Sequence, residues 1–157
     1  MADPTTKVTK STQIVHASGG ATVIAGGMSG SADVSAAPLV GTGNLNSYPR
    51  CDVVLSIVTT AAITTISNQV LLYRRDKNID TGINEIPPNT SNKQHFVGSF
   101  TIPASTTAGA THNVQLTDIP LPGAGDCEFY IENVTPSAFS TGWTLKVTPK
   151  SDVGATS

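Results

Sequence analysis

The stretch CEFYIENVTPSAFSTGWTLKVTPKSD, residues 127–152, carries an alternation of apolar and polar side chains that decides the fold. The apolar residues of its first run share one parity: Cys127, Phe129 and Ile131. After a break rich in Pro, Ser and Gly, the alternation resumes with Trp143, Leu145 and Val147. A period of two places one face of a strand in the core and the other in water. Two such runs joined by a turn-rich connector predict an antiparallel pair of strands.

The opposite parity of the first run carries Glu128, Tyr130 and Glu132. Because they alternate with core residues, we expect these side chains on a solvated strand face or at a subunit contact. Two carboxylates four positions apart on a strand are separated by about 13 Å. A glycosidase pair needs roughly 5–10 Å, so this pair does not indicate glycoside hydrolysis.

Further short strands are expected upstream of this stretch. The apolar patterns place strands near residues 51–59, 69–75, 94–102, 112–117, 127–134 and 142–148. In the third of these, parity places Phe96 inward together with Phe100. Pro and Gly separate the runs, and no ten-residue window has helical periodicity. The pattern predicts an all-β protein, with an antiparallel β-sandwich or jelly roll over 49–150 and a flexible C-terminal tail at 151–157.

Residues 1–48 differ in composition from the rest, and over residues 18–47 Asp33 is the one charged residue. A segment so rich in Gly, Ala and Ser cannot bury enough apolar surface to become ordered alone. We expect an extended N-terminal arm that is ordered by a neighbouring molecule or by the main domain, with a disordered tail as the alternative. Its apolar islands are the candidate binding residues: Val23, Ile24, Leu39 and Val40.

Composition excludes several classes of function. The 157 residues suffice for one domain, the formal net charge is −2, and the longest basic run is Arg74-Arg75. Nucleic-acid binding needs a basic footprint, which is absent, so no nucleic-acid partner is expected. No apolar run reaches the length of a membrane span, and the N-terminus shows no signal-peptide pattern. We therefore expect synthesis in the cytoplasm and no membrane contact.

Catalytic, cofactor and metal motifs are not found in the sequence. The histidines, His16, His95 and His112, stand at no motif spacing, and each is expected to be solvated or structural. Cys51 and Cys127 form no zinc-binding pattern. They are expected to be buried thiols, or a disulfide that forms only after the protein leaves the reducing cell. We expect no enzyme activity, no cofactor and no metal.

The loop DKNIDTGINE, residues 76–85, comes closest to a metal-binding motif. Asp76, Asn78 and Asp80 match the first three ligand positions of an EF-hand calcium loop. The Gly and Glu that follow stand at positions 7 and 10 instead of 6 and 12. A turn between strands is the favoured interpretation, and an adventitious calcium site is the alternative.

The order of segments resembles the jelly-roll decoration, or cement, proteins of tailed-phage capsids. These segments are LLYRRDKNIDTG, PPNTSNKQHFVGSFTIPA, HNVQLTDIPLP, CEFYIENVT and GWTLKVTPKS, and the resemblance extends over residues 51–150. YIEN followed by a turn and WTLKVTP is the most family-like part. The resemblance implies a homotrimer on the outer surface of an icosahedral capsid, at its symmetry axes. Its N-terminal arms would reach over neighbouring major capsid proteins.

A second class remains open, namely a receptor- or carbohydrate-binding β-sandwich module of a phage tail or adhesin. Sugar-binding platforms usually expose aromatic side chains. The candidates for such a platform are Tyr48, Tyr73 and Tyr130.

Overall fold

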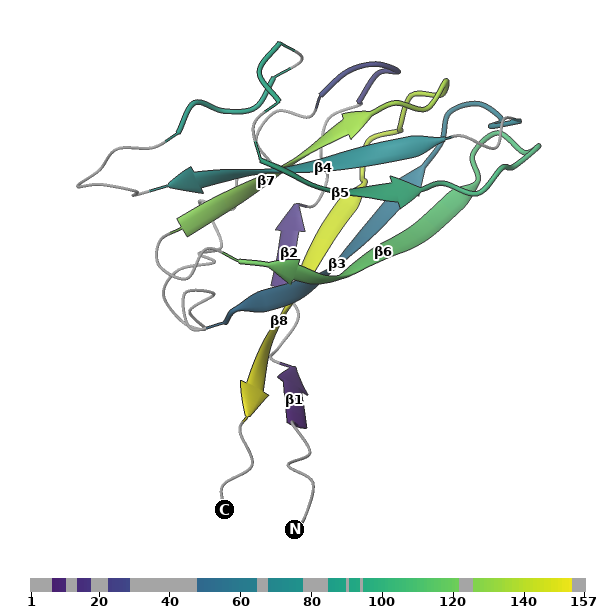
Figure 1. Cartoon of the computed structure of the whole chain (residues 1–157). Helices are drawn as coiled ribbons and strands as arrows, with labels where there is room; N and C mark the ends of the chain where they lie inside the picture. The colour runs from purple at the N-terminus through teal and green to yellow at the C-terminus, as the bar shows by residue number, and fades with distance from the viewer. Residues whose placement is uncertain are drawn as a thin grey trace.

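The chain folds into two antiparallel sheets packed face to face (Figure 1). The computed structural model describes residues 7–10, 14–17, 23–28, 48–64, 68–77, 85–89, 91–93, 95–121 and 126–153. Its strands are β1 (Lys7–Lys10), β2 (Ile14–Ala17), β3 (Arg50–Val58), β4 (Gln69–Lys77), β5 (Phe96–Thr101), β6 (Thr111–Pro120), β7 (Asp126–Asn133) and β8 (Thr144–Val153). These described ranges hold no helix, and hence none that could cross a membrane. The predicted all-β sandwich is confirmed.

The two sheets share the strands in an interleaved order. The larger sheet has the order β1-β8-β3-β6, with β2 also paired to β8, and the smaller sheet has the order β5-β4-β7. From β3 onward, β4 and β5 are the one pair of consecutive strands that lie side by side in the same sheet. Every other connection crosses from one sheet to the other, so most pairings join residues far apart in sequence.

The expected pairing of the two runs in 127–152 is wrong. β7 pairs with β4, whereas β8 pairs with β3 in the opposite sheet. The connector between them crosses the end of the sandwich and buries Phe139 in the core. Alternation shows which face of each strand is buried, but Phe129 and Leu145 reach the same core from opposite sides. The pattern alone therefore does not distinguish a hairpin from a crossing.

The core lies between the sheets and is filled by the inward parity of each long strand. At the edge where β5 approaches β6, a Cβ added to Gly98 would lie 2.9 Å from Cδ1 of Leu116. Glycine therefore allows the two sheets to come close together there. The largest fully buried side chains include Phe100, Phe129, Phe139, Leu55, Ile57 and Ile63.

One strand departs from its predicted orientation. Phe96 was expected to face inward, but it is 58% exposed. The register between β4 and β5 shifts between Leu72 and Tyr73, where a bulge is inserted. Because a one-residue shift reverses the face of every side chain beyond it, Phe96 lies outside while Phe100 stays in the core.

The described parts of the N-terminal 48 residues belong to the domain itself. β1 and β2 pair with successive parts of β8, and Val23 bridges to Phe139. These contacts cover an edge of β8 that would otherwise present unpaired backbone groups. The sequence left open whether the arm is ordered by a neighbouring molecule or by the main domain. The described residues of the arm are attached to the main domain. At the other end, residues 151–153 of the expected flexible tail continue β8.

Candidate functional site

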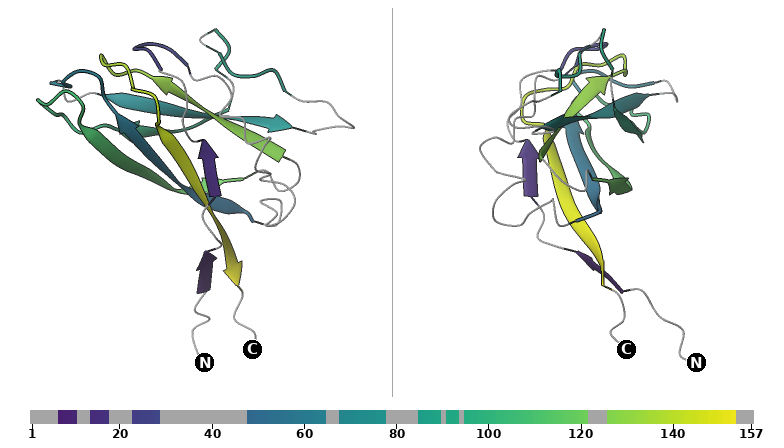
Figure 2. Two further views of the ribbon diagram at one scale, coloured as in Figure 1. Left: turned by 180° about the vertical axis from the view of Figure 1, so that it is seen from behind. Right: turned by 60° about the vertical axis from the view of Figure 1, so that its left-hand side comes forward.

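The end of β8 and β1 form a two-stranded ribbon, residues 150–153 and 7–10, that projects from the sandwich (Figure 1; Figure 2). Pairing between β8 and β3 stops at Lys150, whereas pairing with β1 continues to Val153. Among the described residues, β1 is therefore the one partner of residues 151–153. An isolated two-stranded ribbon is marginally stable in water, and its open edges are ready to pair with another chain.

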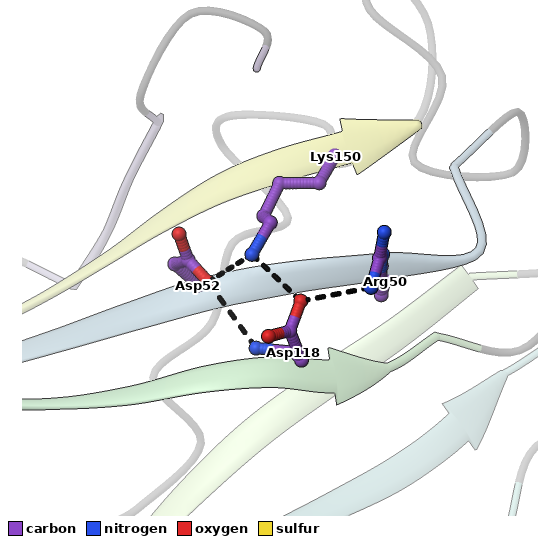
Figure 3. Close-up of polar contacts among 4 residues, drawn as sticks. All are labelled: Arg50, Asp52, Asp118 and Lys150. Atoms are coloured by element: carbon purple, nitrogen blue, oxygen red, sulfur yellow. Dashed lines mark hydrogen bonds and ion pairs between the residues drawn. The ribbon is translucent and has the colours of Figure 1, made fainter. Parts of the chain in front are cut away.

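Four charged side chains, the ribbon-base cluster, lie where the ribbon leaves the sandwich: Arg50, Asp52, Asp118 and Lys150 (Figure 3). Lys150 Nζ lies 2.8 Å from Asp52 Oδ1 and 2.7 Å from Asp118 Oδ1. Arg50 Nη1 lies 3.1 Å from the same Asp118 oxygen. The cluster thus joins β3, β6 and β8 through charge-assisted hydrogen bonds, which are stronger than neutral ones.

A bulge in β6 brings Asp118 into this cluster. The β3–β6 register shifts between Cys51 and Val53, so that Thr117 and Asp118 together face Asp52. Asp118 adopts a φ of 57°, a left-handed conformation that Asp tolerates better than most residues. Its backbone N–H donates to Asp52 Oδ1 at 3.2 Å. The bulge therefore turns the Asp118 side chain toward Lys150.

The charges of the ribbon-base cluster balance, with two cations and two carboxylates. The side chains of Lys150 and Asp52 are 8% and 12% exposed. Hydrogen bonds to Asp118 and Asp52 raise the pKa of Lys150 against the opposing effect of burial. An amine held in the charged form is a poor nucleophile. The geometry therefore fits a structural brace for the base of the ribbon rather than a catalytic centre.

A second polar group, the outer-face network, covers the solvent side of the smaller sheet. Tyr73 Oη donates to Glu132 Oε2 at 2.8 Å, and Lys93 Nζ lies 2.6 Å from Glu132 Oε1. Burial, followed by the hydrogen bond to Glu132, raises the pKa of Tyr73 to about 12. The Tyr73 hydroxyl therefore stays protonated and keeps donating to the carboxylate.

The other half of the outer-face network surrounds Glu128. Arg75 Nη1 and Tyr130 Oη both donate to Glu128 Oε2, each at 3.0 Å. Glu128 and Glu132 are 5% and 6% exposed, so the expectation of a solvated face is wrong, whereas a subunit contact at this face stays a prediction. Alternation correctly placed these side chains on the face of β7 that points away from the core. It carried no information on the side chains of β4 and on Lys93, which cover that face.

Removing one hydroxyl tests this network. Tyr130→Phe should lower the free energy of unfolding by about 1.5–3 kcal/mol, because a buried hydrogen bond to a charged group is lost. Urea denaturation monitored by circular dichroism measures the difference. The control is Tyr48→Phe at a half-buried tyrosine near the start of the sandwich, which should change stability by less than about 0.5 kcal/mol. Equal effects of the two substitutions would contradict the network.

The candidate residues that the structure describes do not gather at one place. Val23 is buried in the core of its own chain, whereas Ile24 is 66% exposed and available to a partner. Leu39 and Val40 lie outside the described residues, so their role in binding stays a prediction. The two aromatic side chains proposed for a sugar platform on the smaller sheet, Tyr73 and Tyr130, are buried.

The remaining candidate residues have structural positions. Cys51 and Cys127 are both buried, and no disulfide joins them. His112 is buried at the start of β6, as a structural histidine would be, whereas His95 is exposed. Sequence reasoning missed the ribbon-base cluster. Its available signal was a charged residue, Asp52, directly before the apolar residues 53–55 of the central strand.

These features define a class of protein, namely a two-sheet antiparallel β-sandwich whose N-terminal segment adds strands to one sheet and whose end projects as a ribbon. No known family model matches the chain, and no curated protein matches it either.

Proposed function

We propose that this protein is a structural virion protein that binds the outer surface of an icosahedral capsid and cements neighbouring major capsid proteins. The partner comes from the resemblance of residues 51–150 to cement proteins of tailed phages. The observation that carries the proposal is the ribbon, residues 7–10 and 150–153, which extends β-structure beyond the sandwich. A projecting pair of strands supports a role in docking, because its edges offer backbone groups for strand addition.

The ribbon-base cluster supports this role mechanically. Lys150 is the last residue of β8 that pairs with β3, and it is held there by Asp52 and Asp118. A ribbon braced at its base transmits a load to the whole sandwich instead of bending at the junction. The resemblance also supplies the homotrimer. Three ribbons on one trimer would raise the overall affinity through effective concentration, since binding of the first holds the others close to the capsid.

Binding to capsids stripped of decoration tests the proposal. Full-length protein should bind saturably and raise the temperature at which the capsids release their DNA, measured by co-sedimentation and dye fluorescence. A variant lacking residues 1–12, which include β1, should bind at least about tenfold more weakly because it lacks one strand of the ribbon. A variant lacking residues 154–157, which follow β8, is the matched control and should bind like the full-length protein.

Two outcomes would contradict the proposal. Failure of the full-length protein to bind capsids would exclude a cement function. It would favour the receptor- or carbohydrate-binding alternative, for which the exposed Phe96 is the available aromatic side chain. Undiminished binding by the variant without residues 1–12, with its circular dichroism spectrum unchanged, would remove the ribbon from the interface.

A further inference from the structure

Three potential metal ligands meet at one end of the smaller sheet. Asp76 lies near the end of β4, Glu85 follows the loop after it, and His95 directly precedes β5. One ligand atom from each residue can be chosen so that all lie within 4.8 Å of one another. This trio does not belong to the ribbon-base cluster or to the outer-face network, and no catalytic motif accounts for it.

Backbone and side-chain hydrogen bonds hold the trio in place. Glu85 Oε2 accepts from the backbone N–H of Asp76 at 2.9 Å, and the Glu85 N–H donates to the Asp76 carbonyl at 3.1 Å. The backbone N–H of Arg74 donates to the His95 carbonyl at 3.0 Å. Three segments of chain are thus fixed to one another before any ion binds, which reduces the entropy that binding must overcome.

The charge of the trio suits a divalent cation. His95 Nε2 lies 2.7 Å from Glu85 Oε1, and the Arg74 guanidinium pairs with Asp76 at 2.7 Å. The site thus holds two acidic side chains, Asp76 and Glu85, against one guanidinium, Arg74.

We propose that Asp76, Glu85 and His95 bind a divalent transition-metal ion, with Zn²⁺ the ion that their chemistry fits best. Zinc takes imidazole nitrogen and carboxylate oxygen ligands at about 2.0–2.2 Å, usually in a tetrahedron. Its ligand atoms are then about 3.4 Å apart, within the range that these three side chains already span. The His95 side chain is 40% exposed, which leaves room for water as the fourth ligand.

The proposed site gives the loop at residues 76–85 a different ion from the one that its sequence suggests. Its sequence approached a calcium motif, but calcium prefers six to eight oxygen ligands. The structure instead joins the two ends of the loop, Asp76 and Glu85, to an imidazole from outside it. A nitrogen ligand and a small ligand number favour zinc over calcium. A bound ion would connect the loop to the β4–β5 end of the sheet.

Calorimetric titration of metal-free, full-length protein with ZnCl₂ at neutral pH tests the site. We expect saturable binding of one ion per chain and no comparable heat with CaCl₂ or MgCl₂. Titration with Co²⁺ should produce the visible absorption of a cobalt ion with few ligands. His95→Ala and Glu85→Gln should each weaken zinc binding at least about tenfold. Substitutions of residues that only support the ligands already cause a loss of about this size.

His16→Ala is the matched control, since it removes a histidine of β2 that is not part of the trio, and it should leave zinc binding unchanged. Three results would overturn the proposal. These are the absence of saturable zinc binding, zinc binding that survives His95→Ala, and tighter binding of calcium than of zinc. A thermal melt of each variant without metal separates loss of the site from loss of the fold.

Discussion

Lys150→Met should lower the free energy of unfolding by about 3 kcal/mol, because it removes the ammonium group that lies 2.8 Å from the buried Asp52 carboxylate. Methionine keeps most of the length and apolar stem of lysine, so the lost charge is the main change. Arg50 remains beside Asp118, whose side chain is 52% exposed and can be hydrated. The greater part of the cost therefore falls on Asp52. Equilibrium denaturation in urea at neutral pH measures this effect.

Lys146→Met is the matched control for this prediction. Lys146 lies on the same strand and the same parity as Lys150, and it is half-buried. Its replacement should change stability by no more than about 0.5 kcal/mol, as is usual away from buried charge networks. Equal losses from the two substitutions would show that the ribbon-base cluster does not brace the sheet.

Stability should fall by up to about 4 kcal/mol between pH 9 and pH 12 through Cys51 alone. Burial, with smaller effects of Cys127 and Asp52, raises the pKa of this thiol from 9.0 to about 12. The unfolded chain therefore loses the thiol proton first, and the unfolded state binds fewer protons over this interval. Under that condition the free energy of unfolding decreases as pH rises. Below pH 9 the same thiol contributes no slope.

Cys51→Ala isolates this contribution. Its stability at pH 7 should be lower than that of the wild type, because a small cavity replaces the sulfur. Above pH 9 its stability should fall less steeply, since no thiol is left to ionise. The pKa values of Tyr73 and Lys150 are also raised. The stability of both proteins should therefore still decrease somewhat at alkaline pH. Parallel curves from pH 9 to pH 12 would contradict the burial of Cys51 as a neutral thiol.

The strands of the sandwich follow from local sequence. In β8, alternation of Leu145 and Val147 with polar residues fixes both the strand and its buried face, and the structure agrees. The central strand β3 was also recognisable, since apolar residues fill its middle. Such features depend on side chains within a few positions of one another, so a single sequence is enough to find them.

The pairing of the strands and the burial of polar side chains could not be predicted, because they depend on contacts between residues far apart in the sequence. Asp52 bonds to groups 66 and 98 positions away, and only the folded sheet brings them together. The bulge that places Asp118 in the ribbon-base cluster and the bulge that turns Phe96 outward are single-residue events. A parity pattern assumes an unbroken register, so each bulge reverses its prediction for the residues beyond it.

Electron cryomicroscopy of stripped capsids incubated with the full-length protein tests the cement function most directly. We expect density for the two-sheet sandwich on the outer surface of the shell. The ribbon of β1 and the end of β8 should face the shell and touch at least two major capsid proteins. A shell that remains bare at saturating protein, or density that contacts a single capsid subunit, would contradict it.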